Sequence, residues 1–149
     1  MATLLDHLGA PERRKRVISD CVLLIEEEVK RKGGLSGMAI KAAFATVKTV
    51  KPGFIAEAVD HLLDDFAQRL EPFYQSHKQS PGNARSLPDH FTGESANIAD
   101  ALLGITDDRA HRAKNVMVKK SYEKLRPSAK KHVEEAIPGI SRLVERHTV

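Results

Sequence analysis

The segment from Lys32 to Gly53, KGGLSGMAIKAAFATVKTVKPG, contains the pattern that decides the fold class. From about Ser36 to Val50, apolar residues occupy almost every side of a helical projection, and a few lysines form a narrow polar stripe. A helix that is apolar nearly all round is typical of a buried position, and alanines let neighbouring helices approach closely. We therefore predict a helix over 36–50 in the middle of a helical bundle.

The glycine-rich start of this segment, GGLSG, raises the question of an anion site. A phosphate-binding loop places backbone N–H groups at a helix N-terminus, usually after a strand and with a lysine at a fixed spacing. GGLSGMAIK follows a helical pattern, and its nearest lysine, Lys41, lies more than one turn inside the predicted helix. We favour a helix stop followed by a tightly packed helix over a phosphate site.

Amphipathic helices are predicted on both sides of this segment. After Pro11, which suits a first helical turn, apolar residues recur at spacings of three and four, which predicts a helix over about 12–32. A similar pattern follows Pro52-Gly53 and predicts a helix that ends at Pro72. The apolar positions are Ile18, Cys21, Val22, Ile25 and Val29 in the first pattern and Val59, Leu62, Leu63, Phe66 and Leu70 in the second.

A polar segment at about 75–93 contains two prolines, two glycines and only two large apolar residues. We predict that it is an exposed connector. Helical patterns then cover about 94–105, 107–125 and 128–147, and no run alternates as a strand does. The prediction is an all-α, single-domain bundle of six helices that spans residues 1–149.

The two parts on either side of the connector, about 12–72 and 94–147, share a sequence pattern. ISDCVLLIEEE at 18–28 aligns with IADALLGITDD at 98–108, and both end in an acidic pair. VKPG in the first part then aligns with LRPS in the second, and the apolar spacing of the helix after each also matches. We interpret the match as an internal duplication of a three-helix unit; the alternative is the apolar spacing that any two amphipathic bundles share.

Length and composition indicate one globular domain. A chain of 149 residues with 41% hydrophobic and 30% charged residues is long and apolar enough to bury one core. The single cysteine, Cys21, excludes an intramolecular disulfide and fits a reducing compartment. The N-terminal sequence lacks the pattern of a signal peptide, and no stretch approaches about 18 apolar residues. We therefore expect a cytoplasmic protein without a membrane span.

One predicted helix carries a group of residues with metal-like chemistry, Glu57, Asp60, His61, Asp64 and Asp65. Di-iron bundles use a Glu-x-x-His step with partners on facing helices, and the step from Glu57 to His61 is one residue too long. The apolar face of this helix leaves the group on its solvated side, so we interpret it as a solvated acidic face. No catalytic motif is present elsewhere, and we predict no catalytic, cofactor-binding or metal-binding residue and no enzyme.

The strongest electrostatic signal is a basic segment at 109–131, in a chain of net charge +4. With RRKR at 13–16 it would form a phosphate-binding stripe if both clusters shared one face. Only Tyr122 offers an aromatic ring for stacking there, and no helix-turn-helix spacing is evident. The candidate contacts to nucleic acid or an anionic surface are Arg109, Arg112, Lys119, Lys120, Lys124, Arg126, Lys130 and Lys131.

The segments KGGLSG, KAAFATVKTVKPG, ADALL and LRPSAKKHV resemble an uncharacterised bacterial family of small all-helical proteins, a domain of unknown function. The resemblance covers the whole chain and implies a bacterial origin and a compact helical domain. It implies no activity, cofactor or catalytic residue, and it makes the connector a local elaboration.

Three functions stay open at this point. We favour a non-enzymatic helical module that binds a protein partner, which the sequence does not identify; a homodimer is compatible with it. One alternative is nucleic-acid or anionic-surface binding through the basic helices around 109–131. The other is a carrier for a small apolar ligand, which predicts an internal pocket beside the alanine-rich stretch at 39–45.

Overall fold

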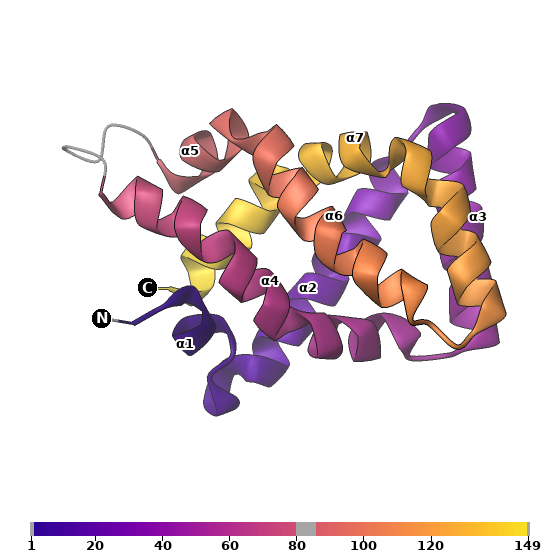
Figure 1. Cartoon of the computed structure of the whole chain (residues 1–149), viewed down its shortest axis with the longest axis horizontal. Helices are drawn as coiled ribbons and strands as arrows, with labels where there is room; N and C mark the ends of the chain where they lie inside the picture. The colour runs from indigo at the N-terminus through magenta and orange to yellow at the C-terminus, as the bar shows by residue number, and fades with distance from the viewer. Residues whose placement is uncertain (1, 80–85, 149) are drawn as a thin grey trace.

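The computed structural model describes residues 2–79 and 86–148 and shows seven helices and no strand within them. The all-α class is confirmed, with seven helices in place of the predicted six. Figure 1 shows how they are arranged. The helices are α1 (Leu4–Leu8), α2 (Pro11–Arg31), α3 (Gly34–Val50), α4 (Phe54–Lys78), α5 (Leu87–Gly93), α6 (Ser95–His111) and α7 (Val116–His147).

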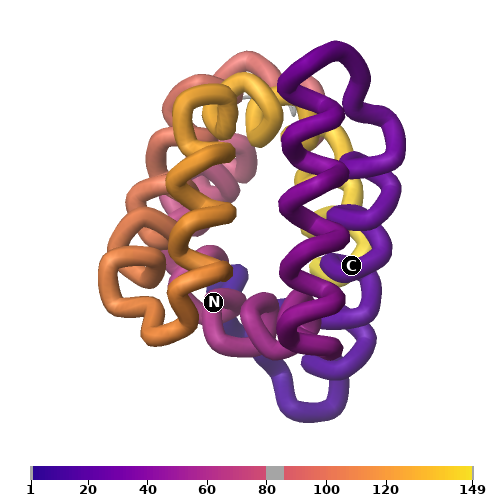
Figure 2. The backbone as a smooth tube through the Cα atoms, turned by 90° about the vertical axis from the view of Figure 1, so that its right-hand side faces the viewer, coloured from indigo at the N-terminus to yellow at the C-terminus, as the bar shows by residue number. Residues whose placement is uncertain are grey.

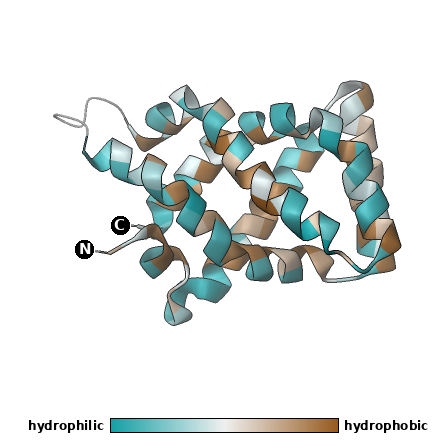
Figure 3. Ribbon diagram, in the orientation of Figure 1, coloured by the Kyte–Doolittle hydropathy of each residue, from teal (hydrophilic) through white to brown (hydrophobic). Residues whose placement is uncertain are grey.

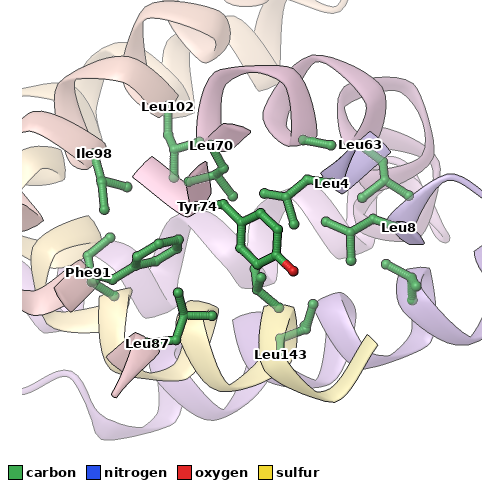
Figure 4. Packing of buried hydrophobic residues seen from close by; sticks show 14 residues of the cluster. Leu4, Leu8, Leu63, Leu70, Tyr74, Leu87, Phe91, Ile98, Leu102 and Leu143 are labelled. Atoms are coloured by element: carbon green, nitrogen blue, oxygen red, sulfur yellow. The ribbon is translucent and has the colours of Figure 1, made fainter. Parts of the chain in front are cut away.

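Helix α1 has no counterpart in the prediction, because its five residues are too few to show a helical period. A capping box holds it: the Thr3 hydroxyl accepts from the Asp6 N–H, and the Asp6 carboxylate accepts from the Thr3 N–H. Its two leucines, Leu4 and Leu8, are buried in the core. Figure 4 shows them beside Leu63 of α4 and Tyr74.

Helix α3 forms where the prediction placed it, but it lies at one end of the molecule rather than in the middle (Figure 1). Leu35 and Met38 are 88% and 67% exposed, and of its residues only Gly37 and Val47 are buried. Figure 3 shows the apolar colouring of this exposed helix. The expectation of a central position was wrong, because apolar composition alone does not fix which helix the others enclose.

The predicted connector at 75–93 is also largely wrong where the structure describes it. Helix α4 continues through Pro72 to Lys78, and residues from Leu87 onward form α5. Ser86 caps α5, since its hydroxyl accepts from the Asp89 N–H at 3.2 Å. Leu87 and Phe91, the two large apolar residues of the segment, are buried in the core. Positions 80–85 lie outside the described residues.

The last two helices replace the three that were predicted there. Helix α6 runs past residue 105 to His111, and Asn115 caps α7 by accepting from the Met117 and Val118 N–H groups. Helix α7 contains Pro127 and Pro138, each of which removes one backbone hydrogen bond. Figure 1 shows that the first part of α7 runs at a steep angle to the rest, as proline kinks allow.

Helix α7 packs against α1, α2, α3, α5 and α6 and therefore joins most of the fold. Figure 2 shows α3 and the first part of α7 as two columns on opposite sides of the interior. Behind them, α2, α4 and the rest of α7 contribute much of the apolar core, with Ile137 and Val144 of α7 almost completely buried. The cavity described below lies among α2, α4, α6 and the later part of α7.

Candidate ligand-binding cavity

An apolar cavity of about 350 Å³, here called the inner cavity, lies between α2, α4, α6 and α7. Ile40 of α3 also reaches it, so it lies beside the alanine-rich stretch as the carrier hypothesis predicted. Its apolar lining consists of Leu8, Cys21, Leu24, Ile25, Val29, Ile40, Val59, Leu63, Phe66, Ala67, Leu70, Leu102, Leu103, Val133, Ala136, Ile140, Leu143 and Val144. The size falls in the range of small-molecule sites, roughly 300–1,000 Å³.

Glu28 of α2, Lys32 directly after it and His132 of α7 also line the inner cavity, as does Thr106; we call the first three residues the polar partition. The Lys32 ammonium lies 3.3 Å from Glu28 Oε1 and 2.8 Å from Glu135 Oε1, and it also donates to the His132 carbonyl oxygen at 3.4 Å. Arg31 pairs with the other carboxylate oxygen of Glu28. The Lys32 and Glu28 side chains are only 8% and 9% exposed. Buried charges of this kind are costly to desolvate and persist where they are paired.

His132 is the one member of the polar partition whose side chain has no hydrogen bond within the described residues. Its side chain is 11% exposed, and its Nδ1 lies 3.4 Å from Glu135 Oε1. Nε2 has no partner at all among those residues. The hydrogen bond from Lys32 lowers the pKa of Glu135, so that carboxylate is ionised beside the imidazole.

A second, polar pocket of about 240 Å³, here called the outer pocket, lies on the other side of the polar partition. Glu28, Lys32 and His132 line both spaces. The remaining lining of the outer pocket is Arg31, Gly33, Ser36, Lys131 and Glu135. The glycine-rich segment and the end of the basic segment therefore meet at one place.

Two glycines of the glycine-rich segment at 33–37 are required by the structure for different reasons. Gly34 has a φ of +69°, in the left-handed region that favours glycine. Gly37 lets the first turn of α3 pack directly onto Lys32, because a Cβ there would lie 2.6 Å from the Lys32 carbonyl carbon. The expected tight packing after a helix stop is thus what the structure shows at Gly37.

Residues 4–148 match a family described as a family of unknown function (DUF6918). The chain belongs to this family. No curated protein and no solved structure matches the chain. The resemblance to an uncharacterised family that the sequence suggested is confirmed, and DUF6918 assigns no ligand to the inner cavity.

In this DUF6918 member the acidic residues of α4 form ion pairs with arginines of other helices. Arg14 binds Asp60 and Asp64 at 2.8 Å each, and Arg109 lies 3.3 Å from Asp65. Among the described residues no group of three or more His, Cys, Asp or Glu side chains could hold a metal ion. Within the same ranges, none of the helices has the length and apolarity needed to cross a membrane.

Ion pairs also occupy half of the candidate anion contacts at 109–131. Arg112 binds Asp108, Arg126 binds Asp107 at 2.7 Å, and Lys130 binds Asp100 at 3.1 Å. The acidic residues of α4 also lie between Arg14 of the RRKR cluster and Arg109. The two basic clusters are therefore separated by carboxylates where they approach each other. The contacts without an ion pair among the described residues are Lys119, Lys120, Lys124 and Lys131.

A surface hollow of about 510 Å³ lies between α6 and the first part of α7. It is larger than the inner cavity, but its charged side chains Asp107 and Arg126 pair with each other. Asp107 accepts from Arg126 and from the Tyr122 hydroxyl, and these hydrogen bonds lower the pKa of Asp107. Burial, together with Asp107, raises the pKa of Tyr122 to about 12. With its strongest donors and acceptor already paired, this hollow offers less to a ligand than the inner cavity.

The sequence contained a signal for the polar partition that the prediction did not use. Glu28 and Lys32 follow Cys21 and Ile25 at helical spacings, so they continue the buried face of α2 rather than its solvated side. Charged residues on an apolar face indicate a paired cluster or a functional site. His132 gave no comparable signal, because its burial depends on the bend in α7.

Proposed function

We propose that this protein is a non-enzymatic binding domain that holds a small apolar molecule in the inner cavity. The observation that carries the proposal is the cavity itself, about 350 Å³ and lined almost entirely by apolar side chains. Protein interiors are otherwise close-packed, with few voids larger than a water molecule. A specific reason is needed for a void of this size.

The energetic cost of the void supports the same proposal. A space of about 350 Å³ between apolar side chains deprives its lining of part of its packing contacts, and this loss costs stability. A ligand that fills the inner cavity would recover much of this cost and would stabilise the folded state by mass action.

The chemistry of the lining favours binding over catalysis. Burial raises the pKa of the Cys21 thiol to about 11, which keeps it protonated and poorly nucleophilic. The Thr106 hydroxyl already contacts the Leu103 carbonyl oxygen and the Tyr122 hydroxyl. The polar partition offers an imidazole without a hydrogen bond but no neighbouring activated nucleophile among the described residues.

The test is a fluorescence titration with phenylnaphthylamine, a neutral dye that brightens in apolar sites. We expect saturable binding to the wild type and a loss of at least about tenfold in affinity in Ala136→Phe, because Ala136 lines the inner cavity. Ala56→Phe adds the same ring at an exposed position of α4 and should bind the dye as the wild type does. Circular dichroism shows whether Ala136→Phe is folded; if it is not, Ala136→Leu replaces it. No binding by the wild type, or equal binding by Ala136→Phe, would exclude this function.

A second candidate is protein interaction through α3, favoured by the exposure of Leu35 and Met38. Val116 and Met117 at the start of α7 are also exposed, at 63% and 45%. Exposed apolar side chains are typical of interaction sites where they form one patch. The test is the mass of the protein in solution by light scattering: a dimer that Leu35→Lys and Met38→Lys convert to a monomer would support this candidate, and a monomeric wild type would exclude self-association.

Nucleic-acid binding through 109–131 stays a weaker alternative, because four of its eight candidate contacts bind carboxylates. An anisotropy titration with labelled duplex at two salt concentrations tests it. Each phosphate contact would contribute about 0.9 to the slope of log affinity against log salt. A variant in which Lys119, Lys120, Lys124 and Lys130 are changed to Glu tests the contacts. If the wild type binds and this variant does not, nucleic-acid binding becomes the preferred function.

The internal duplication also remains a proposal, in a modified form. The first junction, Pro52-Gly53, separates α3 from α4, whereas its counterpart, Pro127-Ser128, lies inside α7. The unit to be compared is therefore α2 and α4 against α6 and the end of α7. In an experimental structure, failure of these two pairs to superpose would exclude the duplication.

A further inference from the structure

We propose that the ligand is a single-chain amphiphile with a carboxylate head group, its chain in the inner cavity and its head in the outer pocket. This inference rests on the proposed function and adds the chemical class of the ligand. It is carried by the juxtaposition of an apolar space and a polar space that share Glu28, Lys32 and His132 as lining residues.

The first step of the inference concerns the polar partition. An apolar ligand such as an arene would need no charged group beside it, and burying Glu28 and Lys32 at 9% and 8% exposure is costly. They lie where the apolar cavity borders the polar outer pocket, so a ligand that reaches both spaces meets polar groups at one end only. The ligand therefore has one polar end.

The second step concerns the groups left without partners. Lys32 is bound by Glu28 and Glu135, so it is not free for a ligand. His132 Nε2 is buried without a hydrogen bond in the part of the chain that the structure describes. A buried polar atom without a partner costs about 1–3 kcal/mol, so this imidazole is an unused hydrogen-bonding group at the boundary of the two spaces. A purely hydrocarbon ligand would leave it unpaired.

The third step concerns the charge of the outer pocket. Three cationic side chains, Arg31, Lys32 and Lys131, line it against two carboxylates, Glu28 and Glu135, which leaves one positive charge. Lys131 is exposed and has no ion pair among the described residues. A carboxylate fits this pocket, whereas an ammonium head group would be repelled.

Helix α3 adds to the same preference. The Gly33 end of this 17-residue helix also borders the outer pocket, and no side chain caps it. Its first backbone N–H groups carry partial positive charge and are free to bind an anion. The glycine segment thus contributes to a head-group site without forming a phosphate-binding loop.

The volume sets the length of the chain. At roughly 30 Å³ for each water-sized group, a cavity of about 350 Å³ holds about a dozen such groups. Saturated carboxylates of roughly ten to twelve carbons match this size. Longer chains would have to extend out of the inner cavity or displace its lining.

The test compares three amphiphiles of equal chain length, dodecanoate, dodecanol and dodecylamine, as competitors of phenylnaphthylamine on the full chain. We expect dodecanoate to compete about tenfold more strongly than dodecanol, as a charge-assisted hydrogen bond would give, and dodecylamine to compete least. Lys131→Glu should remove the preference for the carboxylate while leaving dye binding unchanged, because Lys131 lines the outer pocket and not the inner cavity. Lys120→Glu reverses an exposed lysine of the same helix outside both spaces and should keep the preference.

The outcomes separate this inference from the proposed function. If the dye binds but all three amphiphiles compete equally, or if Lys131→Glu competes as the wild type does, the head-group site is excluded and the apolar cavity stands. If the dye does not bind, both fall together. Lys131 is exposed, so its variant is expected to fold.

Discussion

Gly37 packs directly on the backbone of Lys32, so closely that a Cβ at position 37 would lie 2.6 Å from the Lys32 carbonyl carbon and 2.9 Å from its oxygen. This contact fixes the start of α3 against the end of α2. It also fixes the residue that carries the ammonium group of the polar partition.

Gly37→Ala is therefore expected to destabilise the protein by about 1–3 kcal/mol, the usual cost of overpacking a tight contact. Gly104→Ala is the matched control: it lies inside α6 with no atom within 4 Å of an added Cβ, and alanine there should stabilise by about 0.5–1 kcal/mol. Urea unfolding measures both. Equal effects of the two substitutions would show that the Lys32 contact does not constrain position 37.

Cys21 provides a direct report on the inner cavity, because it lines the cavity and is the single cysteine of the chain. A pKa of about 11 in place of 9.0 leaves about one hundredth of the usual thiolate near pH 8. We expect a thiol reagent to react about a hundredfold more slowly with the folded protein than with the urea-unfolded chain. Saturating dodecanoate should slow the reaction further. A folded rate equal to the unfolded rate would contradict the burial of this thiol.

Asp107 should make stability depend on pH at the acidic end. Hydrogen bonds from Arg126 and Tyr122 lower its pKa in the folded state, so its contribution is complete above the ordinary pKa near 4 and is lost as the pH falls through the lower folded value. Asp107→Asn should cost about 1 kcal/mol at pH 7, an amount reduced by solvent screening of this 35% exposed side chain. The difference from the wild type should shrink below about pH 4.

Asp108→Asn is the control for this prediction, since the neighbouring carboxylate is 68% exposed and pairs only with Arg112 one turn away. Its stability should stay close to that of the wild type across the same pH range, measured by urea unfolding. A pH-independent effect of Asp107→Asn would show that the loss comes from packing and not from the charge.

Phe91 tests whether α5 belongs to the core. It is completely buried, so Phe91→Ala should lower the free energy of unfolding by about 3–5 kcal/mol. Leu35→Ala removes a side chain that is 88% exposed and should change stability by less than about 0.5 kcal/mol. A small effect at position 91 would return this segment to the exposed connector that its composition suggested.

The sequence predicted the helices that carry a clear period and missed what depends on their packing. The apolar stripe from Ile18 to Val29 located α2 to within about one residue at each end. By contrast, Pro72 and Pro127, at which predicted helices ended, both lie inside helices. A proline removes one hydrogen bond, and a long helix held by tertiary contacts tolerates this loss, so the signal used for helix ends gave wrong boundaries.

The sequence predicted an internal cavity only through the hypothesis that the protein carries an apolar ligand beside the alanine-rich helix. Its size depends on how far α2, α4, α6 and α7 stand apart, and no local pattern encodes that distance. The outer pocket is harder still, because it joins Gly33 and Lys131, nearly a hundred residues apart in the sequence. Only the bend of α7 brings them together.

The inner cavity also makes the protein sensitive to hydrostatic pressure. Unfolding removes the void, so the unfolded chain with its water occupies less volume than the folded protein, by roughly 20–100 mL/mol for typical domains and more where internal voids are larger. With about 350 Å³ of space inside, the empty protein should unfold at a lower pressure than the same protein with a bound chain. The difference between those two midpoints would measure how completely the occupant fills the space.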